Sequence, residues 1–200
     1  TNLGTENFIP HLSHTGNIPY LSTIYDTTLY LSPKGIQEPG LATDWTVAED
    51  GLSINLKIRR GVKFHNGGAM TSADVKYSLD LINSPDSRFG MRKAVKEFLD
   101  KVTVVSDYEL RIDLKKPLVS VFLDVLSSSL RVGIMPKDYM ETAGVENANK
   151  EPIGTGAYKL TEHGPGDHIT LTAVDWPHWR VGVPAFEKII IKKVPEASTR

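Results

Sequence analysis

The sequence contains no cysteine, and this absence excludes several kinds of chemistry. Disulfide bonds, thiolate zinc sites and cysteine nucleophiles all require the thiol group. A chain without cysteine is compatible with a reducing cytosol and also with export. The compartment therefore stays open at this point.

An excess of one charge and a long apolar run are also missing. The 23 lysines and arginines nearly balance the 24 aspartates and glutamates, so no basic surface supports a nucleic-acid partner. No apolar run approaches the ~20 residues that a membrane-spanning helix needs. No basic-then-apolar leader opens the sequence at Thr1, so we expect any export signal to lie outside it.

Motifs of enzymes and cofactor sites are not found either. Gly154 and Gly156 lie close together, but a phosphate loop also needs Gly-Lys-Ser/Thr, and a dinucleotide fingerprint needs a third glycine. A nucleophile elbow and a zinc-protease helix do not occur. His11 and His14 are three residues apart with no third ligand nearby, which favours two loop histidines over a metal site. We therefore expect no enzyme activity, no cofactor and no metal.

What the sequence does contain is a mixture of strand and helix patterns. Residues 53–59 alternate apolar and polar, which predicts a half-buried strand, and Thr71 with Asp74 predicts a capping box at the start of a helix. Because strands and helices are interleaved without strict βαβ alternation, we expect mixed sheets and an α/β or α+β architecture. Further strands are expected over residues 102–105, 109–114, 158–160, 169–174 and 187–194. Further helices are expected within 20–30, over 91–100, from Pro117, and as a short helix after Pro136.

Four segments in a fixed order carry a resemblance to a known family. They are 39–52 (PGLATDWTVAEDGL), 56–75 (LKIRRGVKFHNGGAMTSADV), 152–158 (PIGTGAY) and 179–200, which ends in PEASTR. Together they resemble the family 5 extracellular solute-binding proteins, the peptide-, dipeptide- and nickel-binding receptors of ABC importers. Asn66 stands where the family usually has Asp, and the turn after Trp179 is one residue longer than usual.

The resemblance implies a partial type II periplasmic-binding-protein fold of the α/β class. Residues 1–31 and 152–200 would belong to lobe one, residues 32–151 would form an inserted satellite domain, and the second lobe would be absent. The implied location is the periplasm, or a lipid anchor on the outer face of the cytoplasmic membrane.

The resemblance also implies how the protein works. A receptor of this kind, expected to be a monomer, captures a peptide or another small polar solute between its lobes and delivers it to a membrane permease. The alternative is a sensory or chaperone-like interaction module on the same fold. An arginine at position 131 would hold a ligand carboxylate, or it would stabilise carbonyl groups at a helix end. The residues expected to contact the ligand are Ser13, His14, Asn17, Ile18, Tyr20, Arg88, Met91 and Arg131.

Overall fold

The computed structural model describes residues 6–127 and 132–193. Its helices are η1 (Pro10–Leu12) and η2 (Thr15–Asn17), which are 3₁₀ turns, and α1 (Ile18–Ile24), α2 (Ser72–Ile82), α3 (Arg92–Phe98), α4 (Val119–Ser127) and α5 (Lys137–Lys150). Its strands are β1 (Leu29–Leu31), β2 (Gln37–Pro39), β3 (Ala42–Val47), β4 (Ser53–Ile58), β5 (Leu99–Ser106), β6 (Glu109–Leu114), β7 (Tyr158–Gly164), β8 (His168–Ala173) and β9 (Lys188–Lys192).

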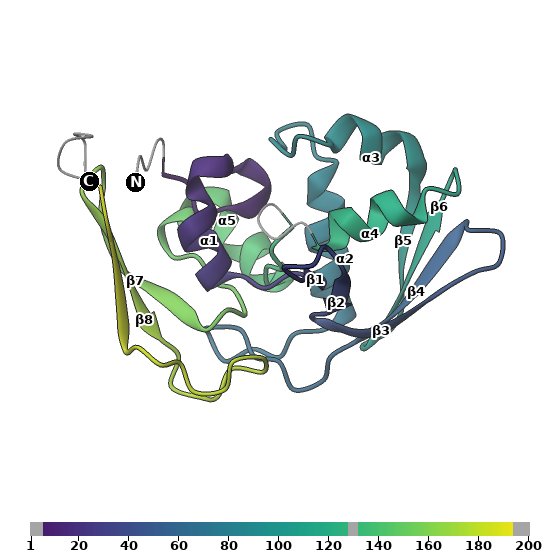
Figure 1. Ribbon diagram of the computed structural model, residues 1–200. Helices are drawn as coiled ribbons and strands as arrows, with labels where there is room; N and C mark the ends of the chain where they lie inside the picture. The colour runs from purple at the N-terminus through teal and green to yellow at the C-terminus, as the bar shows by residue number, and fades with distance from the viewer. Residues whose placement is uncertain (1–5, 128–131, 194–200) are drawn as a thin grey trace.

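The strands form three sheets, in the orders β1-β2, β3-β4-β6-β5 and β7-β8-β9. In Figure 1 the helices lie between the two larger sheets, with α2, α3 and α4 beside one of them and α1 and α5 beside the other. The α/β class is confirmed. Within the described residues, the paired strands run antiparallel, because most neighbouring strands are joined by short connections.

The local patterns at 53–59 and 71–74 form the structures that they predict. In β4 the side chains of Ile54, Leu56 and Ile58 are buried, and those between them are exposed. At the start of α2 the Thr71 hydroxyl accepts from the Ala73 N–H, while the Asp74 carboxylate accepts from the Thr71 N–H at 2.8 Å. This capping box fixes where the helix begins.

Two helix predictions were wrong in extent. Residues 20–30 are not one helix, since α1 ends at Ile24 and Leu29 pairs with Pro39 in a strand. A short apolar run fits either pattern, and strand pairing decides it here. The helix after Pro136 is longer than predicted and runs through the polar stretch to Lys150, with a break at Gly144, where φ is 71°. Its outer face is polar, and only Met140 and Ala148 are buried.

The buried apolar side chains form two clusters. The first fills the space between the four-stranded sheet and α2, α3 and α4, and its members run from Leu29 to Ile134. The second lies between α1, α5 and the β7-β8-β9 sheet, and combines both ends of the chain with Met135, Met140 and Ala148. The division into residues 1–31, 32–151 and 152–200 stays a prediction.

The two ends of the described chain meet at the β7–β8 hairpin. The Glu6 carboxylate accepts from the Gly166 N–H at 3.1 Å, and the Lys193 N–H donates to the Asp167 carbonyl at 2.8 Å. No helix within residues 6–127 and 132–193 is long and apolar enough to cross a membrane.

Candidate functional site

Two of the three regions predicted to contact a ligand lie side by side. The Arg88 backbone N–H donates to the His11 carbonyl at 2.8 Å, which attaches the loop before α3 to the N-terminal segment. The third region, at Arg131, lies outside the described residues. The structure therefore brings together the segment that holds Ser13 to Tyr20 and the segment that holds Arg88 and Met91.

Three of the predicted side chains point inward and bond to the backbone of Asn7. The Asn7 carbonyl receives the Ser13 hydroxyl at 2.8 Å, the Asn17 side-chain amide at 3.1 Å and the Tyr20 hydroxyl at 3.3 Å. Ser13, Asn17 and Tyr20 are all fully buried, and the Tyr20 ring packs 5.0 Å from that of Phe8. Their role as ligand contacts stays a prediction, which this burial does not favour. Asn7, which sequence reasoning missed, organises the segment.

The other four predicted residues lie at the surface of the same region. His14 and Ile18 are half-buried, Arg88 is exposed, and Met91 is 39% exposed. His14 also caps η2, since its Nδ1 accepts from the Gly16 N–H at 3.2 Å. These four residues form the candidate ligand face. Their role also stays a prediction.

His11, in contrast to His14, is buried. Burial lowers the pKa of its imidazole to about 4, against a weaker opposing effect of Asp86, so the ring is neutral at pH 7. No group of three metal-ligating side chains occurs among the described residues, His11 and His14 included. His11 is therefore a buried neutral histidine in the core of this segment.

The glycine turn at 154–156 is fixed by close backbone packing and by His65. A Cβ on Gly154 would lie 2.1 Å from the Ile24 carbonyl oxygen, and one on Gly156 would lie 2.2 Å from that of Thr23. His65 Nδ1 accepts from the Gly154 N–H at 3.3 Å, so its protonated Nε2 donates to the Gly156 carbonyl at 3.0 Å. Burial lowers the pKa of His65, which keeps this neutral form. The turn and the histidine therefore hold each other in position through these two hydrogen bonds.

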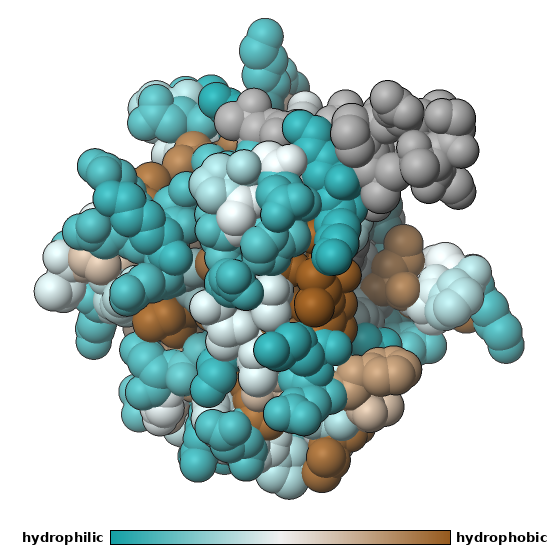
Figure 2. All heavy atoms as spheres, turned by 90° about the vertical axis from the view of Figure 1, so that its left-hand side faces the viewer, coloured by the Kyte–Doolittle hydropathy of each residue, from teal (hydrophilic) through white to brown (hydrophobic). Residues whose placement is uncertain are grey.

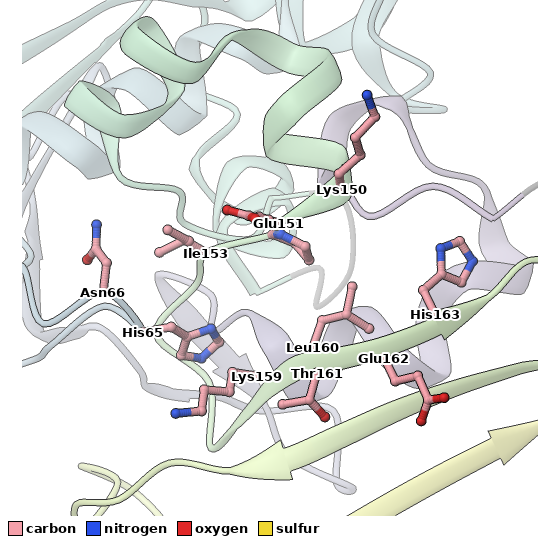
Figure 3. Close-up of a pocket in the computed structure, with 11 residues that line it drawn as sticks. His65, Asn66, Lys150, Glu151, Ile153, Lys159, Leu160, Thr161, Glu162 and His163 are labelled. Atoms are coloured by element: carbon pink, nitrogen blue, oxygen red, sulfur yellow. The ribbon is translucent and has the colours of Figure 1, made fainter.

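A polar hollow of about 460 Å³ opens beside this turn. In Figure 3 it lies between His65, the chain that leaves α5 at Glu151 and Ile153, and the residues of β7 from Lys159 to His163. Its lysines are already paired, Lys150 with Glu146 and Lys159 with Asp175. The hollow therefore presents no unpaired lysine to a ligand.

Asp26 is a buried carboxylate that sequence reasoning missed. Its Oδ2 accepts from the Thr155 hydroxyl at 2.9 Å, His178 Nε2 at 3.0 Å and Trp179 Nε1 at 2.9 Å, and its Oδ1 accepts from the Tyr30 hydroxyl at 2.9 Å. These donors come from three segments far apart in sequence. The carboxylate thus joins the N-terminal segment, the glycine turn and the 175–182 loop, and no local pattern around residue 26 reveals it.

Comparison with known proteins agrees with this architecture. Residues 37–200 match the family model of the bacterial extracellular solute-binding proteins, family 5 Middle. The chain therefore belongs to the family 5 extracellular solute-binding proteins, as the four motifs predicted.

Particular relatives place the chain within that family. The glutathione-binding protein GsiB of Pectobacterium atrosepticum is 32% identical over 164 residues, which are 80% of this chain and 30% of the relative. The structure of MoaA from A. tumefaciens in complex with mannopinic acid superposes with a TM-score of 0.88 at 27% identity, over 98% of this chain and 40% of that one. NikA from Brucella suis in complex with Fe(III)-EDTA gives 0.81 at 30% identity, over 97% and 39%. The chain spans about 30% of the length of the curated relatives that it matches.

Proposed function

We propose that this chain is the first-lobe portion of an extracytoplasmic receptor that captures a small polar solute for an ABC importer. The observation that carries the proposal is the family match over residues 37–200. One relative is named a glutathione-binding protein, and two similar structures are complexes with mannopinic acid and with Fe(III)-EDTA, so the proposed solute is a peptide or another small polar molecule. The receptor acts as a monomer, without nucleic acid, in the periplasm or anchored by a lipid at the outer face of the membrane.

The division into lobes is part of the proposal. The cluster that runs from Leu29 to Ile134 is the core of the inserted satellite domain, and the cluster around α1, α5 and β7–β9 is the core of lobe one. Because Met140 and Ala148 pack with the second cluster, we place α5 in the body of lobe one. In this proposal the satellite domain ends before α5, earlier than the boundary at residue 151 that the sequence predicted.

The candidate ligand face supplies one wall of the binding site in this proposal. Binding must offset the lost freedom of the ligand, and burial between two bodies is how a small solute gains enough contact. Closure of the second lobe over His14, Ile18, Arg88 and Met91 would provide that burial and would be the state that the permease recognises. The 200-residue chain on its own should bind the solute weakly or not at all.

The test uses the full-length product of the gene that encodes this chain. Its thermal unfolding is measured with glutathione, dipeptides, mannopinic acid and a chelated metal, each at increasing concentration. A ligand at one hundred times its Kd adds about 2.7 kcal/mol to the stability, which raises Tm by several degrees. A failure of every solute class to raise Tm would count against the proposal.

Two variants of the full-length receptor test the ligand face. Arg88→Gln removes a charge that can hold an anionic group, and we expect it to weaken the best solute about tenfold or more. Arg111→Gln is the matched control, because Arg111 lies on β6 and pairs with Asp113 at 2.7 Å. Equal binding by the two variants would remove Arg88 from the site and leave the receptor function intact.

A further inference from the structure

A second hollow lies where the C-terminal end of α1 meets the loop that follows β8. Its volume is about 370 Å³, within the range of small-molecule sites, and its lining includes Thr23, Tyr30, Tyr158, Arg180, Val183 and Pro184. None of these residues belongs to the candidate ligand face. The hollow is therefore separate from the candidate ligand face.

Arg180 provides a positive charge at this hollow. Its guanidinium carbon lies 3.5 Å from the centre of the Tyr30 ring, a stacking geometry that limits the side chain to one orientation. No carboxylate in the described part of the chain forms an ion pair with Arg180. A fixed guanidinium without an acidic partner is suited to a two-pronged bond with a carboxylate.

The backbone that carries Arg180 is held in one conformation. His178 Nδ1 accepts from the N–H groups of Arg180 and Val181, each at 3.3 Å, and His178 and Gly182 exchange backbone hydrogen bonds of 2.8 and 2.9 Å. The other nitrogen of the same imidazole is bonded to Asp26 at 3.0 Å. Because the turn is fixed before any ligand arrives, binding at Arg180 would cost little ordering of the loop.

Asp26 is the opposing charge at this site, and the protein already satisfies it. The carboxylate is 3% exposed, and its two oxygens receive four side-chain donors. Its negative charge is therefore directed at groups within the protein. Arg180 is exposed and remains the charge that a ligand meets.

Apolar side chains surround the same turn. Val181 is 57% exposed, Val183 is 77% exposed, and Phe186 is 69% exposed. Single exposed apolar residues are ordinary, but three within six residues beside a hollow form a patch that an apolar group can cover. The face of the molecule shown in Figure 2 is mostly hydrophilic, with apolar atoms exposed near its centre, on its left side and at its lower edge.

We propose that this hollow binds a small amphipathic carboxylate, a monocarboxylic acid with an apolar tail. The carboxylate pairs with Arg180, and the tail lies against Val181, Val183 and Pro184. The complementarity is one of charge and shape, since the lining offers one stacked cation beside exposed apolar side chains. The proposal is independent of the solute that the receptor transports.

The test is a titration of the isotope-labelled 200-residue chain with 4-phenylbutyrate, followed by ¹H–¹⁵N NMR. We expect saturable shifts of the amides at 180–183 with a millimolar Kd. The neutral amide of the same acid, 4-phenylbutanamide, should bind at least tenfold more weakly, because it lacks the charge. No saturation, equal binding of acid and amide, or shifts confined to residues 11–20 and 88–91 would overturn the proposal.

Two variants test separately the charge of Arg180 and the apolar contact with the tail of the ligand. Arg180→Gln should weaken the acid at least tenfold, and Val183→Ser, at an exposed position, should weaken it severalfold without affecting folding. Arg60→Gln is the matched control, because Arg60 also stacks on a tyrosine, 4.1 Å from the ring centre of Tyr108, outside this hollow. Binding by Arg180→Gln as tight as by the unmodified chain, or equal weakening by Arg60→Gln, would also overturn it.

Discussion

The contribution of Asp26 to stability can be tested with two substitutions that differ in what they leave behind. Asp26→Ala removes both carboxylate oxygens and leaves four donors without their acceptor, two of them buried and two partly buried. Each unsatisfied buried donor costs about 1–3 kcal/mol, and relaxation shared between neighbours reduces the sum, so we expect a loss of about 4 kcal/mol or more. Asp26→Asn keeps one oxygen at the Oδ2 position, and the Tyr30 hydroxyl can turn to accept from the new amide. We expect it to cost about 1–2 kcal/mol.

Urea unfolding followed by far-ultraviolet circular dichroism measures both losses. Asp44→Ala is the control, because its ion pair with Lys57 is half-exposed and should contribute less than about 1 kcal/mol. A loss of less than 1 kcal/mol for Asp26→Ala, or equal losses for alanine and asparagine, would show that the four bonds do not act as the structure indicates. A domain of this size has roughly 5–15 kcal/mol of stability, so the alanine variant should still be measurable.

Three further predictions follow from local geometry. The pKa of His11 is lowered from 6.5 to about 4, so the unfolded chain binds a proton before the folded chain does as the pH falls. The free energy of unfolding should therefore drop by up to about 3 kcal/mol between pH 6.5 and 4. His11→Phe should flatten this part of a plot of the urea midpoint against pH. Gly154→Ala should lower Tm by 10 °C or more, because its Cβ would lie 2.1 Å from the Ile24 carbonyl oxygen. Gly68→Ala is the control and should change Tm by a few degrees at most, because its Cβ would meet only the Asn66 side chain, at 3.2 Å. Thr71→Ala should cost about 1 kcal/mol in urea unfolding through loss of the cap, and an unchanged midpoint would contradict the capping-box assignment.

Local sequence patterns predicted those parts of the fold that local physics decides. The alternation in β4 reports burial directly, because neighbouring side chains of a strand face opposite sides. The capping box at Thr71 involves atoms only three residues apart. Gly154 could be identified as a turn residue, but the reason that it must be glycine, the Ile24 carbonyl, is 130 residues away in the chain.

The wrong predictions concern segments whose structure is decided by contacts that a local pattern does not contain. The helix predicted within residues 20–30 included Leu29 because the apolar spacing fits a helix, and the pairing of Leu29 with Pro39 overrides that spacing. The polar stretch of α5 lacks an apolar stripe, but the pair Lys150–Glu146, at 2.9 Å, supports its last turn. A search for apolar periodicity detects neither the pairing of distant strands nor ion pairs on the surface of a helix.

At the candidate site, too, the sequence pattern does not reveal which partner a side chain contacts. Polar residues such as Ser13 and Asn17 in a segment that resembles a ligand-binding one can face the ligand or the protein, and sequence gives no sign of which. The structure turns them toward the Asn7 carbonyl, so their polar groups bond to the backbone of the segment. His14, Ile18, Arg88 and Met91 lie at the surface of the same region and stay candidates for contact with a ligand.

If the proposed function holds, Asp26 shows how a buried charge can serve a receptor that works by moving rigid bodies. A lobe transmits closure only if its own segments keep their positions, and segments that are far apart in sequence gain little from local structure. Thr155 and Trp179 lie more than 120 positions after Asp26, and one carboxylate bonds to both. Apolar packing could hold the same segments together, but it would not fix their register, because it is not directional. A carboxylate with four directed bonds does fix the register, at the cost of its desolvation. If the proposed function holds, loosening this junction by Asp26→Asn should therefore weaken solute binding by the full-length receptor more than its small stability loss alone would.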